Sequence, residues 1–149
     1  MARTTTGRNA CDVAIWIDDA AGTPTDVSGS MNQARMTFTN TLGEFVVFGY
    51  DAVNRLCCGQ DGTFELDIWY TTTANEGKDL VFIWYFVTPC TPRTVSIYLP
   101  DKNVGSDHIY AEMLIETMDV VADRGDAKPM PVTLRLVPNG VINKVTDAT

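Results

Sequence analysis

The chain has 149 residues, of which 45% are hydrophobic and 20% charged, a composition typical of one folded domain rather than a disordered segment. The 19 acidic residues outnumber the 11 lysines and arginines, so the formal net charge is −8 and a basic groove that grips phosphates is not expected. The longest apolar run, Leu80 to Val87, has eight residues, far short of the ~20 that span a bilayer, and no membrane insertion is expected.

The first ten residues are polar and basic and lack the apolar core of a signal peptide, which predicts a flexible N-terminal arm over residues 1–10. Four cysteines follow, at positions 11, 57, 58 and 90. Because Cys57 and Cys58 are adjacent and the domain is not small, we expect free thiols in a reducing cytoplasm rather than disulfides. Both are expected to be small core residues.

The dominant hydrophobic period after residue 12 is two, which is typical of strands with one buried face. Six segments show it: 13–18, 34–39, 64–71, 94–99, 109–116 and 132–137. Turn-forming sequences occur at 18–22, 59–62, 101–105 and 124–126. The pattern predicts a mainly β fold, an antiparallel β-barrel or sandwich.

One segment has helical spacing instead. Thr73 and Glu76 fit a capping box, and Pro89 would end the element, so a single short helix is predicted over about 76–86. The apolar positions at helical spacing, expected to face the core, are Leu80, Ile83, Trp84 and Val87. The opposite face is also apolar, so the helix needs a second cover besides its own sheet.

Residues 45–50 pose the same problem, because both faces of a strand there would be apolar. Such a segment is either a central strand or a surface hidden by another chain. Two doubly apolar elements in so short a chain favour an obligate oligomer, and a compact monomer whose core encloses both is the alternative. The predicted oligomer-interface residues are Phe45, Val46, Phe48, Tyr50, Phe82, Tyr85 and Phe86.

The sequence offers little that points to catalysis. His108 follows Ser106 and Asp107 directly, whereas a catalytic triad needs groups that converge from separate parts of the fold. No Cys-x-x-Cys, calcium-loop, phosphate-loop or dinucleotide motif occurs. We therefore predict no enzyme activity, no catalytic residues, no cofactor and no metal site.

The acidic residues are unevenly placed. Residues 62–76 contain three acids and no base, and residues 108–123 contain four acids and no base. These acids fall mainly on the polar faces of predicted strands, where they would form an electronegative wall that repels DNA. Solubility alone also explains them, and composition does not separate the two interpretations.

In chain order, these pieces resemble a major tail tube protein of long-tailed bacteriophages, of the tail tube and injection-system tube superfamily. The resemblance covers residues 11–142 and is carried by segments 26–29, 33–39, 42–49, 59–71, the helix, 92–100 and the closing strands 110–116 and 131–140. It divides the chain into an arm (1–10), a tail-tube-like β domain (11–142) and a C-terminal tail (143–149).

The resemblance implies a homo-oligomer whose rings, typically hexameric, stack into a hollow tube in the virion tail, assembled in the cytoplasm of a bacterial host. Double-stranded DNA would pass through without specific binding, and a tape-measure protein and tail-tip or terminator proteins would be partners. The lumen-facing acids would be Glu65, Asp67, Glu112 and Glu116. Host, ring symmetry and the presence of a contractile sheath stay open.

Two other function classes are weighed against this one. A carbohydrate- or receptor-binding β-sandwich could use Trp16, Trp69 and Tyr98 as a sugar-stacking platform. A small hydrolase would rest only on the density of carboxylates.

Overall fold

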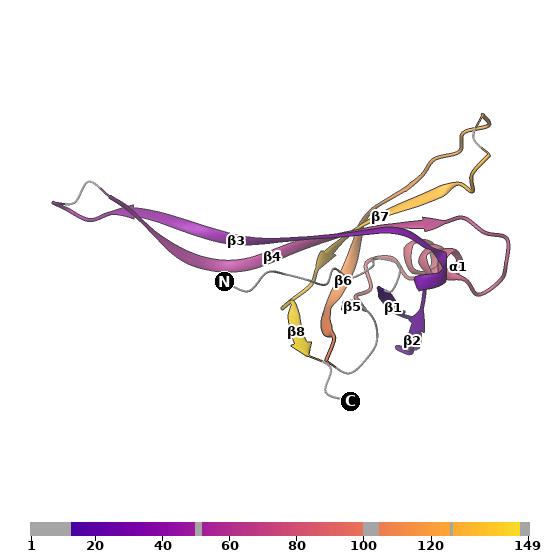
Figure 1. Cartoon of the computed structure of the whole chain (residues 1–149), viewed down its shortest axis with the longest axis horizontal. Helices are drawn as coiled ribbons and strands as arrows, with labels where there is room; N and C mark the ends of the chain where they lie inside the picture. Colours follow the sequence, from indigo (N-terminus) through magenta and orange to yellow (C-terminus); the bar gives the residue numbers. More distant parts are fainter. Residues whose placement is uncertain (1–12, 50–51, 100–104, 126, 147–149) are drawn as a thin grey trace, which may run out of the picture.

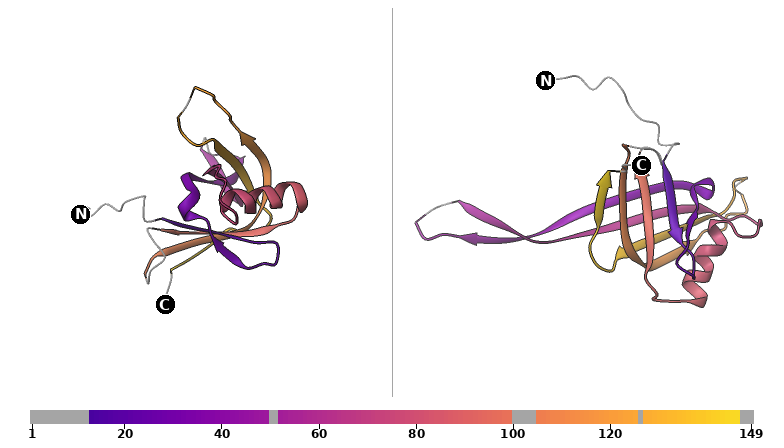
Figure 2. Two further views of the ribbon diagram at one scale, coloured as in Figure 1. Left: turned by 90° about the vertical axis from the view of Figure 1, so that its right-hand side faces the viewer. Right: turned by 90° about the horizontal axis from the view of Figure 1, so that it is seen from below.

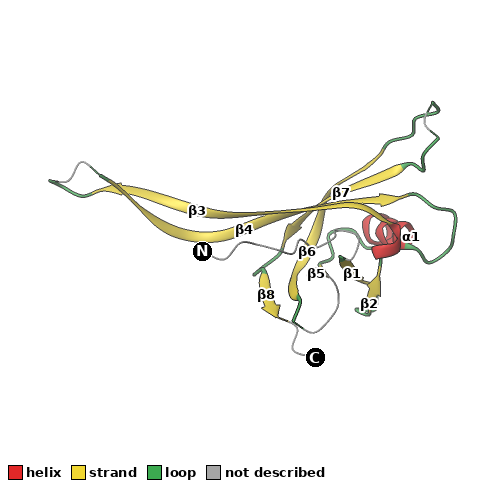
Figure 3. Cartoon of the chain, in the orientation of Figure 1, coloured by secondary structure: helices red, strands yellow, loops and turns green. Residues whose placement is uncertain are grey.

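The computed structural model describes residues 13–49, 52–99, 105–125 and 127–146. It consists of an eight-stranded antiparallel sheet and one short helix (Figures 1 and 3). The strands are β1 (Ala14–Asp18), β2 (Pro24–Asp26), β3 (Met31–Val46), β4 (Val53–Trp69), β5 (Arg93–Leu99), β6 (Asp107–Val120), β7 (Pro131–Pro138) and β8 (Asn143–Thr146). A short 3₁₀ turn (Ser28–Ser30) precedes β3.

The predicted antiparallel β class with one helix is confirmed, and the barrel alternative is not. The strand order is β2-β1-β5-β6-β7-β4-β3, with β8 beside β6, so β2 and β3 end an open sheet within the described chain. The sheet instead doubles over into a sandwich (Figure 2). Strand β6 joins the layers: residues Asp107–Met113 pair with β5, and residues Met113–Val120 pair with β7. A bulge between Ile115 and Thr117 interrupts β6 where it enters the second layer.

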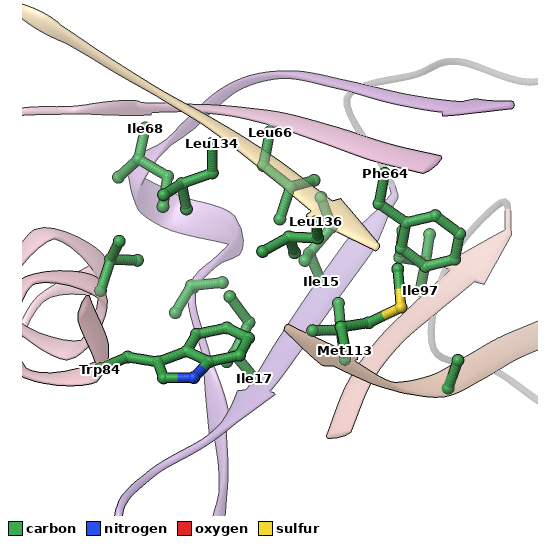
Figure 4. Close-up of a cluster of buried hydrophobic side chains, with 14 residues drawn as sticks. Ile15, Ile17, Phe64, Leu66, Ile68, Trp84, Ile97, Met113, Leu134 and Leu136 are labelled. Carbon is green, nitrogen blue, oxygen red and sulfur yellow. The ribbon is translucent and has the colours of Figure 1, made fainter. Parts of the chain in front are cut away.

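The core lies between the two layers (Figure 4). One layer contributes alternate residues of β4 and β7, among them Phe64, Leu66 and Leu134, and the other contributes Ile17 and Ile97; all five are fully buried. This strict alternation is what the period of two in the sequence predicted. The buried side chains that Figure 4 labels are Ile15, Ile17, Phe64, Leu66, Ile68, Trp84, Ile97, Met113, Leu134 and Leu136.

The helix forms where the sequence predicted it, but its buried face differs. Helix α1 (Gly77–Phe82) continues into a π-helical turn (Ile83–Val87). Its buried residues are Gly77, Val81 and Trp84, whereas Ile83 and Val87, expected in the core, are exposed. In the π-helical turn, backbone hydrogen bonds join residues five apart instead of four. The residues after Phe82 are therefore rotated about the helix axis relative to a regular α-helix.

The predicted capping box at the start of the helix is also wrong in detail. Glu76, not Thr73, is the N-cap residue, and its side chain caps no backbone amide. The Thr71 hydroxyl donates to the Glu76 carboxylate instead. One turn into the helix, the Asp79 carboxylate accepts a hydrogen bond of 2.8 Å from the Asn75 backbone N–H. Asp79 therefore has the role that the sequence assigned to Glu76.

Strands β3 and β4 are much longer than predicted and form a hairpin that projects from the sandwich (Figure 1). Residues 59–62, predicted as a turn, lie inside β4 and pair with residues 38–41. The apolar segment at 45–48 is therefore the far end of a two-stranded hairpin, and the central-strand alternative is wrong. Strands β2 and β8 were not predicted; β8 falls in the segment assigned to the C-terminal tail.

The described cysteines differ from expectation in burial. Cys57, Cys58 and Cys90 are free thiols, as expected, but all three are exposed rather than in the core. Cys57 and Cys58 lie on the hairpin, opposite Leu42, where a second bulge interrupts the β3–β4 pairing. Cys11 and the predicted arm lie outside the described residues. Among the described residues, no helix has the length and hydrophobicity required to cross a membrane.

Candidate assembly surfaces

The distal part of the hairpin is the first surface. Phe48 is fully exposed, and Phe45, Val46 and Leu56 are also exposed. Among the described residues of this region, an ion pair between Arg55 and Glu44, at 3.0 Å, links the side chains of the two strands. An apolar group of this size that the sandwich does not cover marks an interaction site. Tyr50, predicted with this group, lies outside the described residues.

The second surface is the outward side of α1 and the π-helical turn. Phe82, Tyr85 and Phe86 form a ring cluster whose centroids lie 5.0 and 5.7 Å apart, and Tyr70 of the preceding loop adds a third contact at 6.0 Å. Phe86 is 64% exposed and Val87 is 70% exposed. The structure thus brings the half-buried Phe82 together with the exposed Tyr85 and Phe86 in one patch, at the end of the molecule opposite the hairpin (Figure 1).

The second surface, called the helix patch below (Phe82, Tyr85, Phe86 and Val87), is held in place by the contacts of Trp84 and Arg93. Trp84 is fully buried, and its indole Nε1 donates to the Thr91 carbonyl oxygen at 2.7 Å. The Arg93 guanidinium lies 5.4 Å from the Trp84 ring and donates to the Asp18 carbonyl oxygen and the Thr88 hydroxyl. Burial lowers the pKa of Arg93, and desolvation raises the pKa of Asp18. These contacts fix the end of the helix against β1 and β5.

The third surface is the outer face of the layer formed by β3, β4, β7 and the second half of β6. One row across this face runs Arg35, Glu65, Arg135, with Thr117 opposite Arg135 on β6. The bulged residue Glu116 accepts an ion pair from Arg135 at 2.9 Å. Positive and negative side chains therefore alternate along this row.

The next row carries Gln33, Asp67, Thr133 and Asp119. Of the four acids assigned to a lumen, Glu65, Asp67 and Glu116 share this face. Glu112 pairs with Thr94 of β5 and lines a separate hollow of about 300 Å³ with Asp18, Asp19 and Arg93.

The same layer has two unpaired strand edges. Strand β3 pairs with β4 on one side, and no strand pairs with its other side in the described part of the chain. Strand β6 pairs with β5 only up to Met113, so within the described ranges Leu114–Val120 have a free side opposite β7. Free edges of this length expose rows of backbone N–H and C=O groups that another strand can pair with.

The proposed sugar platform does not form. Trp16 and Tyr98 lie on β1 and β5, which pair with each other, whereas Trp69 ends β4. Strands β6 and β7 stand between β5 and β4, so Trp69 lies apart from the other two rings.

His108, considered above as a possible catalytic-triad residue, packs between aromatic rings. His108 lies inside β6, with its ring stacked on Tyr98 at 4.2 Å and against Tyr110 at 4.9 Å. No group of three or more His, Cys, Asp or Glu side chains is placed to hold a metal ion within the described ranges.

Comparisons with known proteins identify the fold. No family model and no curated protein matches the sequence. Among solved structures, a chain of the SPP1 tail tube superimposes with a TM-score of 0.75 at 10% identity, covering 96% of this chain and 81% of that one. A chain from the tail of an empty gene transfer agent particle, with C6 symmetry, gives 0.69 at 10% identity over 94% and 100%. A chain of the 6-fold symmetrised baseplate of the anti-feeding prophage gives 0.70 at 12% identity over 98% of both chains.

These matches extend over nearly the whole chain, including the sandwich and the hairpin. The fold is that of subunits found in tail and baseplate assemblies. More particularly, it is the fold of a tail tube protein, as the resemblance in the sequence implied.

Proposed function

We propose that this chain is the subunit of a hollow phage tail tube, a structural protein of the virion that conducts the genome and carries out no covalent chemistry. The observation that carries the proposal is the four-stranded layer β3-β4-β7-β6, which is polar on its outer face and unpaired at both edges. The fold match to a tail tube chain supports it.

The topology of this layer suits ring closure. Each of its three internal pairings is antiparallel, so β3 and β6, at its two edges, run in opposite directions. When copies are placed head to tail around an axis, β3 of one meets β6 of the next in antiparallel orientation. A layer with an even number of strands therefore continues as one antiparallel sheet from copy to copy, and a closed ring has no free edge left.

The polar outer face fits the inside of such a ring. Glu65, Asp67 and Glu116 would then line the lumen together with Arg35 and Arg135. Mixed charges in adjacent rows keep the wall hydrated without a continuous basic surface that would bind phosphates, so double-stranded DNA passes without specific binding. Glu112 is not on this layer's outer face, and we assign it no lumen role.

The two apolar surfaces provide further contacts. The hairpin extends beyond the sandwich, where Phe45, Val46 and Phe48 can reach a neighbouring ring, and the helix patch can pack on an adjacent copy. Six copies per ring are proposed from the six-fold symmetry of two matched assemblies. A tape-measure protein inside the tube and tail-tip or terminator proteins at its ends would be the other partners.

The test is direct observation of the purified protein. We expect rings or long tubes of uniform width in negative-stain electron microscopy, together with a large species in analytical ultracentrifugation. A protein that stays monomeric at high concentration, also with the other tail proteins of its phage present, would contradict the proposal.

A further inference from the structure

We propose that opposite charges on the two free edges, Arg35 on β3 against Glu116 and Asp119 on β6, select head-to-tail pairing between copies of this chain. The inference rests on the proposed tube function and specifies the partner of each edge: the occupant of the β3 edge is the β6 edge of a second copy. It also accounts for how the long edges avoid pairing with themselves.

The charges of the two edges are complementary. Residues 31–40, the part of β3 that lies on the sandwich, contain one arginine and no acid. Residues 114–120, the free side of β6, contain two acids and no base. All three charged side chains point to the outer polar face. Arg35 lies opposite Glu65 in the sheet, and Glu116 forms an ion pair with Arg135 on that face. Asp119 lies two residues after Thr117 on the same strand and therefore faces the same side. An edge-to-edge contact would thus bring opposite charges to the same side of the sheet.

The charged groups are available for a second copy. Arg35 is exposed and has no ion pair within 4 Å among the described residues. Glu116 pairs with Arg135, but its side chain is still 47% exposed, so its carboxylate can accept a second donor. Asp119 is exposed.

Pairing of like edges is the competing arrangement. Two β3 edges related by a two-fold axis would bring Arg35 against Arg35, and two β6 edges would bring four acids together. Like charges directly opposite across strands destabilise the pairing. Pairing of like edges through a two-fold axis gives dimers, whereas head-to-tail pairing gives rings. The charges that favour head-to-tail pairing therefore also disfavour a dimer that cannot grow into a ring.

The experiment uses two edge variants of the full chain. Arg35→Glu makes both edges negative, and the double variant Glu116→Lys/Asp119→Lys makes both positive. We expect each alone to need about tenfold more protein for assembly, because two favourable pairs become unfavourable at every contact. An equal mixture should assemble like the wild type and contain both variants in equal amounts, since each negative β3 edge then meets a positive β6 edge.

Two controls separate charge pairing from general damage. Arg124→Glu changes net charge as much as Arg35→Glu but lies in the β6–β7 loop, and Glu112→Lys lies on β6 where β5 covers the edge; both should assemble normally. About 1 M salt shortens the screening length to about 3 Å and should reduce the defect of each edge variant.

Circular dichroism would verify that every variant is folded. The inference is overturned if folded edge variants assemble like the wild type, or if the mixture assembles no better than its components. If the wild type and both controls fail to form rings, the proposed function itself is wrong, and this inference with it.

Discussion

The fully exposed Phe48 at the end of the hairpin allows folding and assembly to be separated by one substitution. We expect Phe48→Asp to leave the domain folded and to weaken its polymerisation. The side chain lies beyond the sandwich and outside the core cluster, so its removal empties no buried volume. The free energy of unfolding should change by no more than about 0.5 kcal/mol, as for other surface positions.

Leu66→Ala gives the opposite result and serves as the comparison. Leu66 is fully buried between the two layers, so truncation leaves a cavity and should cost about 2–5 kcal/mol. For assembly the ranking reverses. A phenylalanine side chain buried against another copy contributes about 1.5–3 kcal/mol, so its loss should raise the concentration needed for assembly about 10- to 100-fold.

Urea unfolding followed by tryptophan fluorescence would measure stability, and sedimentation with electron microscopy would measure assembly. Gln60→Glu is the matched control, since it adds the same charge to an exposed polar position of the hairpin on β4, away from the free edge of β3. The reasoning is refuted if Phe48→Asp unfolds the domain as Leu66→Ala does, or if it polymerises at the wild-type concentration.

Three further predictions concern other parts of the chain. Gly62→Ala should destabilise the fold by about 1–3 kcal/mol and lower Tm, because a Cβ there would lie 2.7 Å from the Ile142 side chain and 3.0 Å from the Thr37 carbonyl oxygen; an unchanged Tm would contradict this. The Lys78 ammonium and the Asn75 amide hold the pKa of Asp79 below its ordinary value of 3.8, so its ionised form stabilises the fold at neutral pH. That contribution is present above 3.8 and is lost as the pH falls through the lower folded-state pKa, so the Tm advantage of the wild type over Asp79→Asn should shrink in acid, and an advantage independent of pH would argue against it. Glu65→Lys should still form tubes but release DNA more slowly from assembled particles, as measured by the rate of genome ejection, because an added lumen cation binds phosphates; a wild-type rate would place Glu65 outside the lumen.

The strands of the sandwich were predictable because their faces see different surroundings. Phe64 and Leu66 face the core, whereas the alternate residues Glu65 and Asp67 face outward. Apolar and polar residues therefore alternate with a period of two in the sequence. The distal hairpin has no such difference between its faces, since neither is covered by the chain itself. Its glycine-containing segment 59–62 was therefore predicted as a turn, whereas the two strands of the hairpin are joined earlier in the chain, between Val46 and Val53.

The helix face was mispredicted for a different reason. Spacing alone did not distinguish two apolar stripes on one element, and the π-helical turn after Phe82 shifts which residues reach the core. Trp84 was correctly placed, whereas Ile83 and Val87 were not. The excess of apolar residues on the helix was still informative, because a helix that is covered on one side only is expected to be polar on its other face.

The placement of the charged residues relative to one another was also not predictable from the sequence. The sequence showed acids on the polar faces of two strands, but the pairing decides which bases stand beside them. Arg35 and Arg135 flank Glu65 only because β3 and β7 are its neighbours in the sheet, and Glu116 reaches Arg135 only because a bulge turns it toward that row. An electronegative wall in the sequence thus becomes an alternating row in the fold. The alternation ends in a cation, Arg35, at one edge and in acids at the other, which is the arrangement that a second copy placed head to tail would continue.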